Sequence, residues 1–323
     1  MPKKQKSKNK INLLISVIVS VVLLPIFTVL WCFYGPFEPA RRTWICTAMS
    51  TANHKYLATA FFSDETIKKY TEQYFSSINE LPKQDKTAIN IGDNGGKITR
   101  ESVRIGLSKG VLLRIPDPSK IDVSVCNRIG GTGMTLDKFI MQEKAIAGIN
   151  AGAYADKEGS AHGSVPDGII IKDGKTVYFN EDSNEEFCII GFDKNNLLVV
   201  DYIKSQQQAE ALNLRCAVSF GPPLILNGKG LITESGNSLQ PRSAIAQCAD
   251  GSVLFLVLDG RQPSSAGATL KNVQDLLLEQ GAVTAANLDG GSSTAMIFED
   301  KLLNSPSDKG ELKRIPSAFV VKE

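Results

Sequence analysis

Two aspartates in this 323-residue chain stand at the end of apolar runs and are followed at once by glycine. Asp289 precedes Gly290 and Gly291, and Asp259 precedes Gly260. A strand that ends in this way carries a carboxylate at its tip, and glycine lets the backbone approach a ligand closely. Paired carboxylates are typical of acid–base and nucleophilic catalysis, so Asp289 and Asp259 are the first candidates for catalytic residues.

The glycines after Asp289 lead into three hydroxyl-bearing residues, Ser292, Ser293 and Thr294. Successive backbone N–H groups in such a turn can form a concave binding site for an anion. The alternative is an ordinary glycine turn between strands, in which Asp289 caps the turn and the hydroxyls bond the loop. An isolated Asp-Gly-Gly sequence does not decide between these two interpretations.

Two arginines accompany the aspartates. Arg261 lies two residues after Asp259, and Arg242 follows Pro241 at the start of an apolar run. The guanidinium group offers a rigid fork of donors that suits phosphate. As an alternative, the arginines close loops through ion pairs with the aspartates. The combination of two arginines with two aspartates favours a site for a phosphate and a sugar.

A third apolar run ends at Asn150, and Tyr154 follows four positions later. Asn150 is a candidate ligand for a sugar hydroxyl and Tyr154 for stacking on a sugar ring, although a turn asparagine and a core tyrosine are equally consistent with the pattern. His162 lies in a later loop. It is a candidate proton shuttle because an unperturbed imidazole titrates near neutral pH, and a plain surface histidine is the alternative.

The sequence predicts no cofactor and no nucleic-acid partner. His54 and His162 are the only histidines, and no Cys/His cluster has the short spacing of a structural zinc site. Of the 36 basic and 34 acidic residues, seven and one lie in the first 42 positions, which leaves 29 basic against 33 acidic residues beyond them. This mildly acidic remainder lacks the basic surface of a nucleic-acid binder.

The elements that must hold these side chains are short apolar strands bounded by glycine, from residue 101 onward. We expect strands at residues 103–115, 121–126, 146–150, 168–171, 187–192, 197–201, 217–220, 243–247, 253–258, 283–288 and 318–321. We expect helices at residues 136–143, 206–212 and 270–280. Because βαβ alternation is lacking, residues 101–323 are predicted to form an α+β domain with a mixed or antiparallel sheet and few helices.

An uncharged apolar run at residues 11–34 precedes this domain and is long enough to cross a membrane. Five lysines precede the run and two arginines follow it, so residues 1–10 are expected in the cytoplasm as a basic tail and the domain outside. The prediction is a single-pass protein of the cell membrane, with a cleaved signal peptide as the alternative. Residues 35–100 are expected to form a juxtamembrane linker with one short amphipathic helix.

Six segments of the chain resemble, in sequence and in order, the phosphodiester glycosidase family. They are NAGAY at 150–154, PDGIIIKDGK at 166–175, SFGPPLILNGK at 219–229, QPRSAI at 240–245, LDGRQPSSAGATL at 258–270 and NLDGGSSTAMIF at 287–298. The resemblance implies an α+β domain that hydrolyses sugar-1-phosphodiesters of the N-acetylglucosamine type. It also implies a pocket lined by Asn150, Arg242, Asp259, Arg261 and Asp289.

A phosphodiester leaves a sugar as an acidic anion, so stabilisation of the departing charge matters more than its protonation. We expect Arg242 and Arg261 to hold the phosphate, assisted by the backbone amides of residues 292–294. One of Asp259 and Asp289 then acts as nucleophile or base at the anomeric carbon, and the other orients water or a sugar hydroxyl. The sequence does not show which aspartate has which role.

The partner expected from the family and the topology is a phosphorylated glycan or glycoconjugate of the cell envelope, such as an exopolysaccharide. Two alternatives remain open. One is a membrane-tethered module that binds such a glycan without cleaving it. The other is a phosphodiesterase that breaks the P–O bond with a divalent metal on the two aspartates, a reading that the lack of a His/Asp ligand cluster disfavours.

Overall fold

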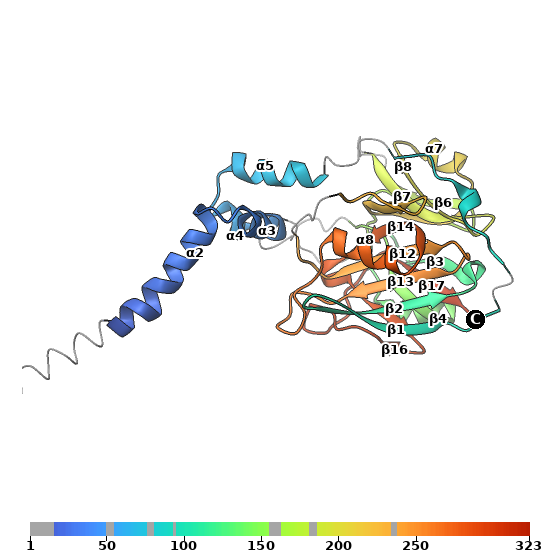
Figure 1. The fold of residues 1–323 in the computed structure, drawn as a ribbon. Helices are drawn as coiled ribbons and strands as arrows, with labels where there is room; N and C mark the ends of the chain where they lie inside the picture. The colour runs from blue at the N-terminus through green and yellow to red at the C-terminus, as the bar shows by residue number, and fades with distance from the viewer. Residues whose placement is uncertain are drawn as a thin grey trace, which may run out of the picture. The chain divides into compact units, whose positions relative to one another are not determined.

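The computed structural model describes residues 16–49, 55–75, 81–92, 95–154, 163–180, 186–233 and 238–323. These residues belong to two compact units, Met1–Tyr74 and Phe75–Glu323 (Figure 1). Each unit has its own hydrophobic core. His162 and His54 lie outside the described residues.

The described part of the first unit begins with an apolar helix, Ser16–Tyr34, whose mean hydropathy is 2.5. It includes a π-helical stretch, Val19–Leu23, and helix α2, Leu24–Tyr34. At 1.5 Å per residue its 19 residues reach about 28 Å, which is close to the thickness of the hydrocarbon layer of a membrane. A signal sequence near an N-terminus has the same properties, so the helix fits an anchor and a signal sequence alike.

Three short helices complete the first unit: α3 at Glu38–Met49, α4 at Tyr56–Thr59 and α5 at Asp64–Phe75. They pack around Phe33, whose ring centroid lies 5.0 Å from that of Trp44 and 5.3 Å from that of Phe62. Helix α5 begins directly after Ser63, whose hydroxyl accepts the N–H of Thr66. Helices α3 and α4 fall in residues that the sequence pattern assigns to a linker.

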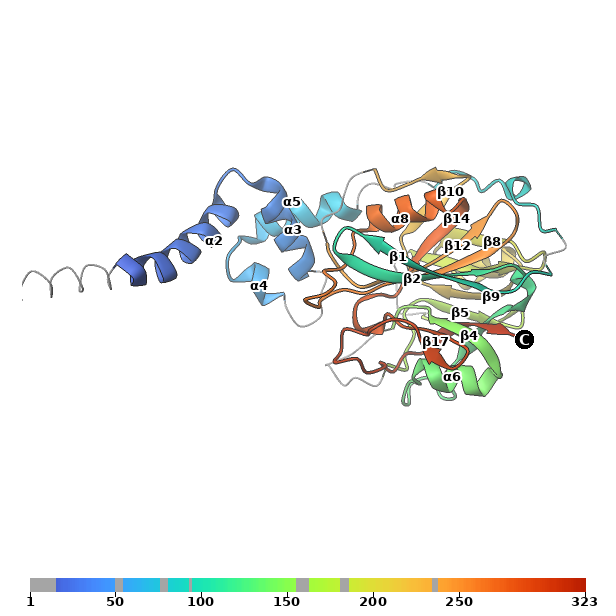
Figure 2. The same cartoon turned by 60° about the horizontal axis from the view of Figure 1, so that its bottom comes forward.

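The second unit contains three antiparallel sheets and three α-helices among its described residues (Figures 1 and 2). The seven-stranded sheet has, in spatial order, β1 Thr99–Ile105, β2 Ser108–Ile115, β13 Val253–Leu258, β12 Arg242–Cys248, β14 Ala282–Leu288, β10 Pro223–Leu226 and β11 Lys229–Gly230. One five-stranded sheet has β16 Lys301–Leu302, β15 Met296–Phe298, β4 Ala145–Asn150, β17 Ser317–Lys322 and β3 Ile121–Val125. The other has β6 Lys175–Phe179, β5 Ile169–Lys172, β9 Leu214–Ser219, β7 Phe187–Asp193 and β8 Leu198–Ile203.

Helices α6, Leu136–Glu143, α7, Gln206–Ala211, and α8, Leu270–Glu279, lie on these sheets. Helix α8 packs against β10 and β14, and α6 packs against β4 and β17. The hydroxyl of Thr269 accepts the N–H of Asn272 at 3.1 Å, and the Asn272 side chain accepts the N–H of Thr269, so a reciprocal cap starts α8. The α+β class with antiparallel sheets and few helices, preceded by one apolar helix, is confirmed.

The strand expected at residues 103–115 is in fact a hairpin of β1 and β2. Gly106 has a φ of +53° and turns the chain between them, a conformation that glycine adopts without steric cost. The prediction was wrong because the apolar pattern continues through the turn. The short strands β6, β10, β11, β15 and β16 were also not predicted, since two to five residues give little periodicity.

The core of the second unit lies where the three sheets meet. Phe192 of β7, Phe255 of β13 and Phe319 of β17 are fully buried, and each comes from a different sheet. The ring centroid of Phe319 lies 6.3 Å from that of Phe192 and 6.5 Å from that of Phe255. Aromatic pairs at this separation attract one another beyond their buried area. Phe319 therefore joins all three sheets.

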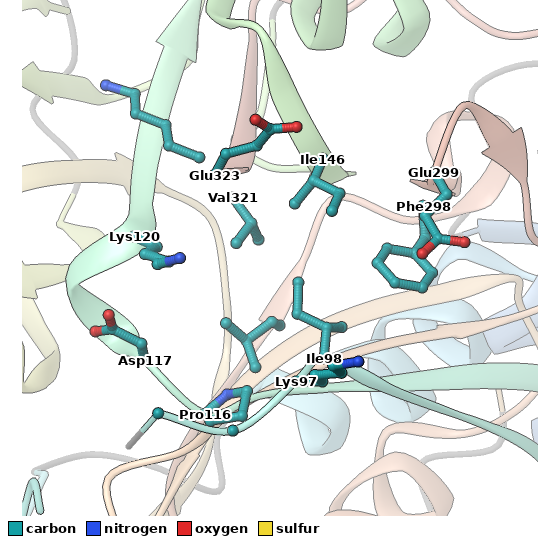
Figure 3. Close-up of a pocket in the computed structure, with 14 residues that line it drawn as sticks. Lys97, Ile98, Pro116, Asp117, Lys120, Ile146, Phe298, Glu299, Val321 and Glu323 are labelled. Atoms are coloured by element: carbon teal, nitrogen blue, oxygen red, sulfur yellow. The ribbon is translucent and has the colours of Figure 1, made fainter. Parts of the chain in front are cut away.

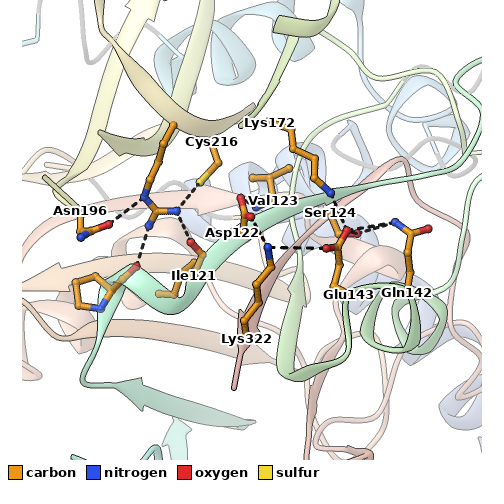
Figure 4. Close-up of polar contacts among 12 residues, drawn as sticks. Ile121, Asp122, Val123, Ser124, Gln142, Glu143, Lys172, Asn196, Cys216 and Lys322 are labelled. Atoms are coloured by element: carbon orange, nitrogen blue, oxygen red, sulfur yellow. Dashed lines mark hydrogen bonds and ion pairs between the residues drawn. The ribbon is translucent and has the colours of Figure 1, made fainter. Parts of the chain in front are cut away.

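Polar contacts reinforce the junction of the two five-stranded sheets (Figure 4). Arg215 of β9 donates to the Pro118 carbonyl at 2.8 Å and to the Asn196 side chain at 3.0 Å. The Glu143 carboxylate accepts a hydrogen bond from Lys172 of β5 at 2.7 Å. Lys172 and this hydrogen bond lower the pKa of Glu143 against the opposing effect of burial. The contacts hold β5 and β9 against the sheet of β3 and β17.

The segment at residues 81–92 runs across the second unit and ties two sheets together. The side-chain nitrogen of Gln84 donates to the Leu198 carbonyl at 2.6 Å and to the Thr284 hydroxyl at 3.1 Å. Lys86 forms an ion pair with Asp193 at 2.8 Å. Although the sequence pattern assigns this segment to a linker, these contacts bind it to β8 and β14.

Candidate active site

Four strands bring the predicted site residues to one rim of the second unit. Strand β13 ends directly before Asp259, and β14 ends directly before Asp289. Strand β12 runs antiparallel to both, so Arg242 at its start lies opposite Leu258. Strand β4 ends at Asn150. The backbone N–H of Asp289 donates at 3.0 Å to the carbonyl of Ala151, the residue after Asn150.

Asp289 carries a buried oxygen that has no partner. Its Oδ2 atom is inaccessible to solvent and forms no hydrogen bond in the structure. Burial raises the pKa of Asp289 to about 6, although Ser293, Gly290 and the positive charges of Lys313 and Arg261 all favour the ionised form. A buried acceptor without a donor is costly, and such atoms are often found where a substrate binds.

Two arginines lie beside the turn that follows Asp289. The Arg261 guanidinium packs against Gly291, where a Cβ atom would meet its two terminal nitrogens at 3.4 Å. Arg242 is buried and donates to two backbone carbonyls, those of Ala268 at 3.0 Å and Ser238 at 2.9 Å. Desolvation and the neighbouring Arg242 charge lower the pKa of Arg261.

Within the described ranges neither guanidinium forms an ion pair with a carboxylate. Arg261 donates instead to the side-chain oxygen of Gln240. The alternative in which Arg242 and Arg261 close loops as Arg–Asp ion pairs therefore finds no support in this part of the chain. Two close positive charges without an anionic partner are suited to bind an anion such as phosphate.

Asp259 is held by two donors on one oxygen. Its Oδ1 accepts the backbone N–H of Ser305 at 2.9 Å and the side-chain amide of Asn304 at 3.2 Å. Burial raises the pKa of Asp259, while these donors and Lys109 act in the opposite direction. The Oδ1 atom of this carboxylate is thus fixed by two donors from the segment at residues 304–305.

Asn304 links this carboxylate to the turn after Asp289. Its amide nitrogen also donates to the Thr294 carbonyl at 3.0 Å, and its oxygen accepts the N–H of Met296 at 3.0 Å. Sequence reasoning missed Asn304 because no motif surrounds it. An asparagine after a two-residue strand gives no signal of its contacts with a carboxylate distant in sequence.

Asn150 hydrogen-bonds to the backbone and side chains around the turn after Asp289. It is fully buried, its amide nitrogen donates to the Asp289 carbonyl, and its oxygen accepts the Ser243 hydroxyl at 2.7 Å and the Ala295 N–H at 3.1 Å. Both polar atoms are therefore engaged within the protein, and the expected contact with a sugar hydroxyl finds no support in these bonds. Asn150 instead positions the loop that carries Asp289.

The turn after Asp289 includes a short 3₁₀ helix, Gly291–Ser293. A Cβ atom at Gly290 would lie 2.7 Å from the Pro241 carbonyl oxygen, so only glycine fits there. The N–H groups of Ser293 and Thr294 donate within the turn, to the carbonyls of Gly290 and Gly291. These two amides are therefore occupied, in contrast to the expectation that they bind the phosphate, and Ser292 is the remaining member of that predicted group.

Tyr154 lies on the far end of this turn from Arg261. Its hydroxyl is 3.4 Å from the Ser293 hydroxyl, and the Lys313 ammonium lies 5.4 Å from its ring centroid. Tyr154 is half-buried, as is Lys313. The structure thus gathers every predicted site residue in the described ranges around one turn, and it adds Asn304 and Lys313.

Residues 143–322 match the family model of the phosphodiester glycosidases, which is more than half of the chain. The chain belongs to this family. The match includes every candidate residue named above. A similar sequence is that of the SPbeta prophage-derived uncharacterized protein YomE of Bacillus subtilis, with 27% identity over 182 residues, 54% of this chain and 27% of that protein.

The N-acetylglucosamine-1-phosphodiester alpha-N-acetylglucosaminidase of Mus musculus is 25% identical over 222 residues, 62% of this chain and 41% of the mouse protein. The chain thus spans about a quarter and two fifths of the length of these two curated relatives. Among solved structures, the zebrafish catalytic domain of that enzyme, auto-inhibited by its pro-peptide, has a TM-score of 0.58 at 20% identity, covering 73% of this chain and 86% of its own. A putative exported protein of Burkholderia pseudomallei has a TM-score of 0.52 at 16% identity, covering 67% and 74%. Both share the fold.

The pocket shown in Figure 3 is separate from the rim of this phosphodiester glycosidase domain. Its walls include Ile115 at the end of β2, Ile146 at the start of β4 and Phe298 at the end of β15. The candidate site lies at the opposite ends of the same strands, beside the start of β2, the end of β4 and the start of β15. The two regions share no residue.

A metal centre is not apparent in the described part of the chain, where no three His, Cys, Asp or Glu side chains form a cluster. The acceptors near the site are the carboxylates of Asp289 and Asp259, and the charged side chains around Asp289 are cations. His162, the predicted proton shuttle, belongs to the residues that the structure does not describe.

Proposed function

We propose that this chain hydrolyses the glycosidic C–O bond of sugar-1-phosphodiesters of the N-acetylglucosamine type. The observation that supports this most strongly is the unpartnered, buried Oδ2 of Asp289 beside arginines that have no carboxylate partner in the described ranges. A carboxylate for the anomeric carbon and cations for the phosphate are the two parts that this reaction needs.

Arg261 and Arg242 are the proposed phosphate ligands. A phosphodiester carries one negative charge, and the departing phosphomonoester gains a second as the C–O bond breaks. Cations already in place stabilise this developing charge without reorganisation. Ser292 is proposed to contribute a further contact, and Gly290 and Gly291 give the phosphate access to the backbone.

Asp289 is the proposed base or nucleophile. As a base, it accepts a proton from water while the water oxygen bonds to the anomeric carbon and the phosphomonoester leaves with the electron pair of the C–O bond. As a nucleophile, Asp289 itself bonds to that carbon, and water then releases the sugar. Asp259, fixed by Asn304 and Ser305, is proposed to orient water or a sugar hydroxyl with its Oδ2. His162 is proposed to carry the proton from the site to solvent.

The apolar helix suggests on which side of the membrane the domain binds its substrate. If Ser16–Tyr34 anchors the chain with its basic tail inside, the domain faces a phosphorylated glycan or glycoconjugate outside the cell membrane. An envelope polysaccharide, such as an exopolysaccharide with sugar-phosphate links, is the substrate class that we propose. Tyr154 is proposed to stack on its sugar ring.

The test uses the full chain in detergent micelles with an N-acetylglucosamine-1-phosphodiester in water enriched in ¹⁸O. Free sugar that carries the label, with an unlabelled phosphomonoester, is the expected result. Asp289→Asn should remove turnover, and Asp300→Asn, a change in an exposed turn, should preserve it. Label in the phosphate would show P–O cleavage, and binding without product from a panel of sugars would show a binding module. Either result would overturn the proposal.

A further inference from the structure

The last turn of the apolar helix belongs to the core of the first unit. Phe33 in this turn is buried, and its ring centroid lies 5.4 Å from that of Phe61, in addition to its contacts with Trp44 and Phe62. The carbonyl oxygen of Phe33 accepts a hydrogen bond from the Arg41 guanidinium at 3.1 Å. The short helices of the unit therefore pack around a ring that the apolar helix supplies.

These contacts distinguish an anchor from a removable signal sequence, which the composition of the helix does not. A signal sequence is cut just behind its apolar run, so cleavage here would remove Phe33 from the chain. The first unit would then lose the centre of its core. A core that depends on the end of the helix favours a helix that stays attached.

Four exposed aromatic side chains lie at the same end of the helix. They are Trp31, Tyr34, Phe37 and Phe61, each 43–58% exposed, and we call them the aromatic patch. The ring centroids of Trp31 and Phe37 are 6.0 Å apart, and the Tyr34 hydroxyl donates to the Phe61 carbonyl at 2.6 Å. Trp31 and Tyr34 are three positions apart in α2 and thus neighbours on its surface. The patch joins the end of α2, the turn after it and the chain after α4.

The place of the patch in the sequence matches the boundary of a membrane. Residues 16–31 are exposed and carry no charge, and a helix that is apolar on all sides needs apolar surroundings. About 20 apolar residues cross the hydrocarbon layer, and such a run counted from Ile11, the first residue after Lys10, ends near Leu30. Trp31 follows directly. Tryptophan and tyrosine favour this boundary because their rings are apolar and their N–H or O–H groups are polar.

We propose that the first unit docks on the surface of a lipid bilayer through the aromatic patch, at the point where the retained helix Ser16–Tyr34 leaves the membrane. Phe37 and Phe61 lie outside the helix, so the folded unit itself contacts the lipid headgroups in addition to the span. The bilayer is recognised through aromatic rings, without any need for a charged lipid. This inference does not rest on the proposed function.

Tryptophan fluorescence tests the docking, because both tryptophans of the chain belong to the first unit. The full chain with Trp31→Phe and Trp44→Phe is reconstituted into phosphatidylcholine vesicles whose acyl chains are brominated near the headgroup. Phe37→Trp or Phe61→Trp then places a single tryptophan in the patch. Lys69→Trp is the matched control, since it places one at an exposed, charged position of α5.

Bromine quenches only nearby tryptophans, so the two patch variants should be quenched about threefold more strongly than Lys69→Trp. Equal quenching in all three variants would overturn the docking, whether the unit is then wholly immersed or wholly in water. Lipids brominated at the ends of the acyl chains should quench the patch variants less than lipids brominated near the headgroup. The reverse order would place the patch inside the hydrocarbon layer and would also overturn the inference.

The mass of the protein tests the retention of the helix. The full chain with a C-terminal tag is produced in bacterial cells, and the membrane fraction is washed with alkaline carbonate and analysed by mass spectrometry. The expected product stays in the membrane pellet and still contains Ser16–Tyr34. A soluble product that begins after Tyr34 would overturn the inference. Neither measurement depends on turnover, so a chain that cleaves no sugar phosphodiester refutes the proposed function alone.

Discussion

The free energy of a single carboxylate connects the stability of this protein with its proposed activity. Asp289 has a buried oxygen without a donor, and burial raises its pKa to about 6. Such a group destabilises the folded state whenever it is ionised, and proteins keep strain of this kind mainly at functional sites. The energetic cost of Asp289 is therefore itself an argument for a role in catalysis.

The pKa of Asp289 predicts how its replacement changes stability with pH. An aspartate in an unfolded chain titrates near 3.9, so the folded state holds the proton more tightly and stability falls as pH rises from about 4 to about 6. A shift of about two units corresponds to about 3 kcal/mol above pH 6. Asp289→Asn should raise the free energy of unfolding by up to this amount at pH 8 and change it little at pH 4.

The measurement is chemical denaturation of both chains at the two pH values, followed by far-ultraviolet circular dichroism. Asp300→Asn, in an exposed turn, should show no such pH dependence. A loss of stability in Asp289→Asn of equal size at pH 4 and pH 8 would mean that the ionised carboxylate is well solvated. The assignment of a desolvated site would then fail.

Single residues also show how far the sequence foretold the site. Asp259, Asp289, Arg242 and Arg261 stand in short motifs next to apolar runs, and the combination of two carboxylates with two arginines is what selected them as candidates. Asn150 was selected by the same logic, and its amide nitrogen and oxygen both hydrogen-bond within the protein. Whether an amide faces a ligand or a backbone depends on packing from other strands, which no local pattern encodes.

At the scale of elements, the site depends on a segment that the motifs do not reveal. Residues 303–316 have an ordinary loop composition, and their contacts with Asp259 and Tyr154 join positions far apart in the chain. Most of the longer strands were foreseen, among them β4, β12, β13 and β14. Their antiparallel partners were not, because a pairing such as β2 with β13 leaves no trace in either strand alone.

Asn304 offers a test of this segment. Asn304→Ala removes a donor from Asp259 and two bonds from the turn after Asp289, so both carboxylates lose part of their fixed geometry. On the proposed function, we expect kcat to fall about ten- to hundredfold with little change in KM, since the proposed phosphate ligands Arg242 and Arg261 remain. The acid limb of the pH profile should move upward, because the lost donor favoured the ionised form of Asp259.

Ser305→Ala is the matched control for Asn304→Ala. Ser305 donates to Asp259 through its backbone N–H, which alanine retains, so kcat should stay close to that of the natural chain. Steady-state kinetics of the three proteins across pH make the comparison. An equal loss in both variants would show that the whole segment has been disturbed, and the specific role of Asn304 would be refuted.

At the scale of the whole molecule, the pattern of short strands and few helices was enough to predict the α+β class. It did not predict that three sheets surround one core. That arrangement follows from side chains that meet only after folding, above all Phe319 between Phe192 and Phe255. The segment at residues 81–92 adds a further tie through Gln84. Its polar composition predicted a linker. The sequence of the segment does not indicate that Gln84 donates hydrogen bonds to the Leu198 carbonyl and the Thr284 hydroxyl.

The shared core predicts the largest effect of any single truncation. Phe319→Ala removes the ring that all three sheets contact and should lower the free energy of unfolding of the second unit by about 3–5 kcal/mol. Amide hydrogen exchange is the appropriate probe, because both tryptophans, Trp31 and Trp44, belong to the first unit and their fluorescence does not report on the second. Protection should fall in β7, β13 and β17 together, since the three strands share Phe319 as a neighbour.

Leu107→Ala, at a loop position that is 80% exposed, should change protection by less than about 0.5 kcal/mol. Loss of protection confined to β17 would show that the sheets hold separate cores, and the rim that joins Asp259, Asp289 and Asn150 would then need another explanation for its rigidity.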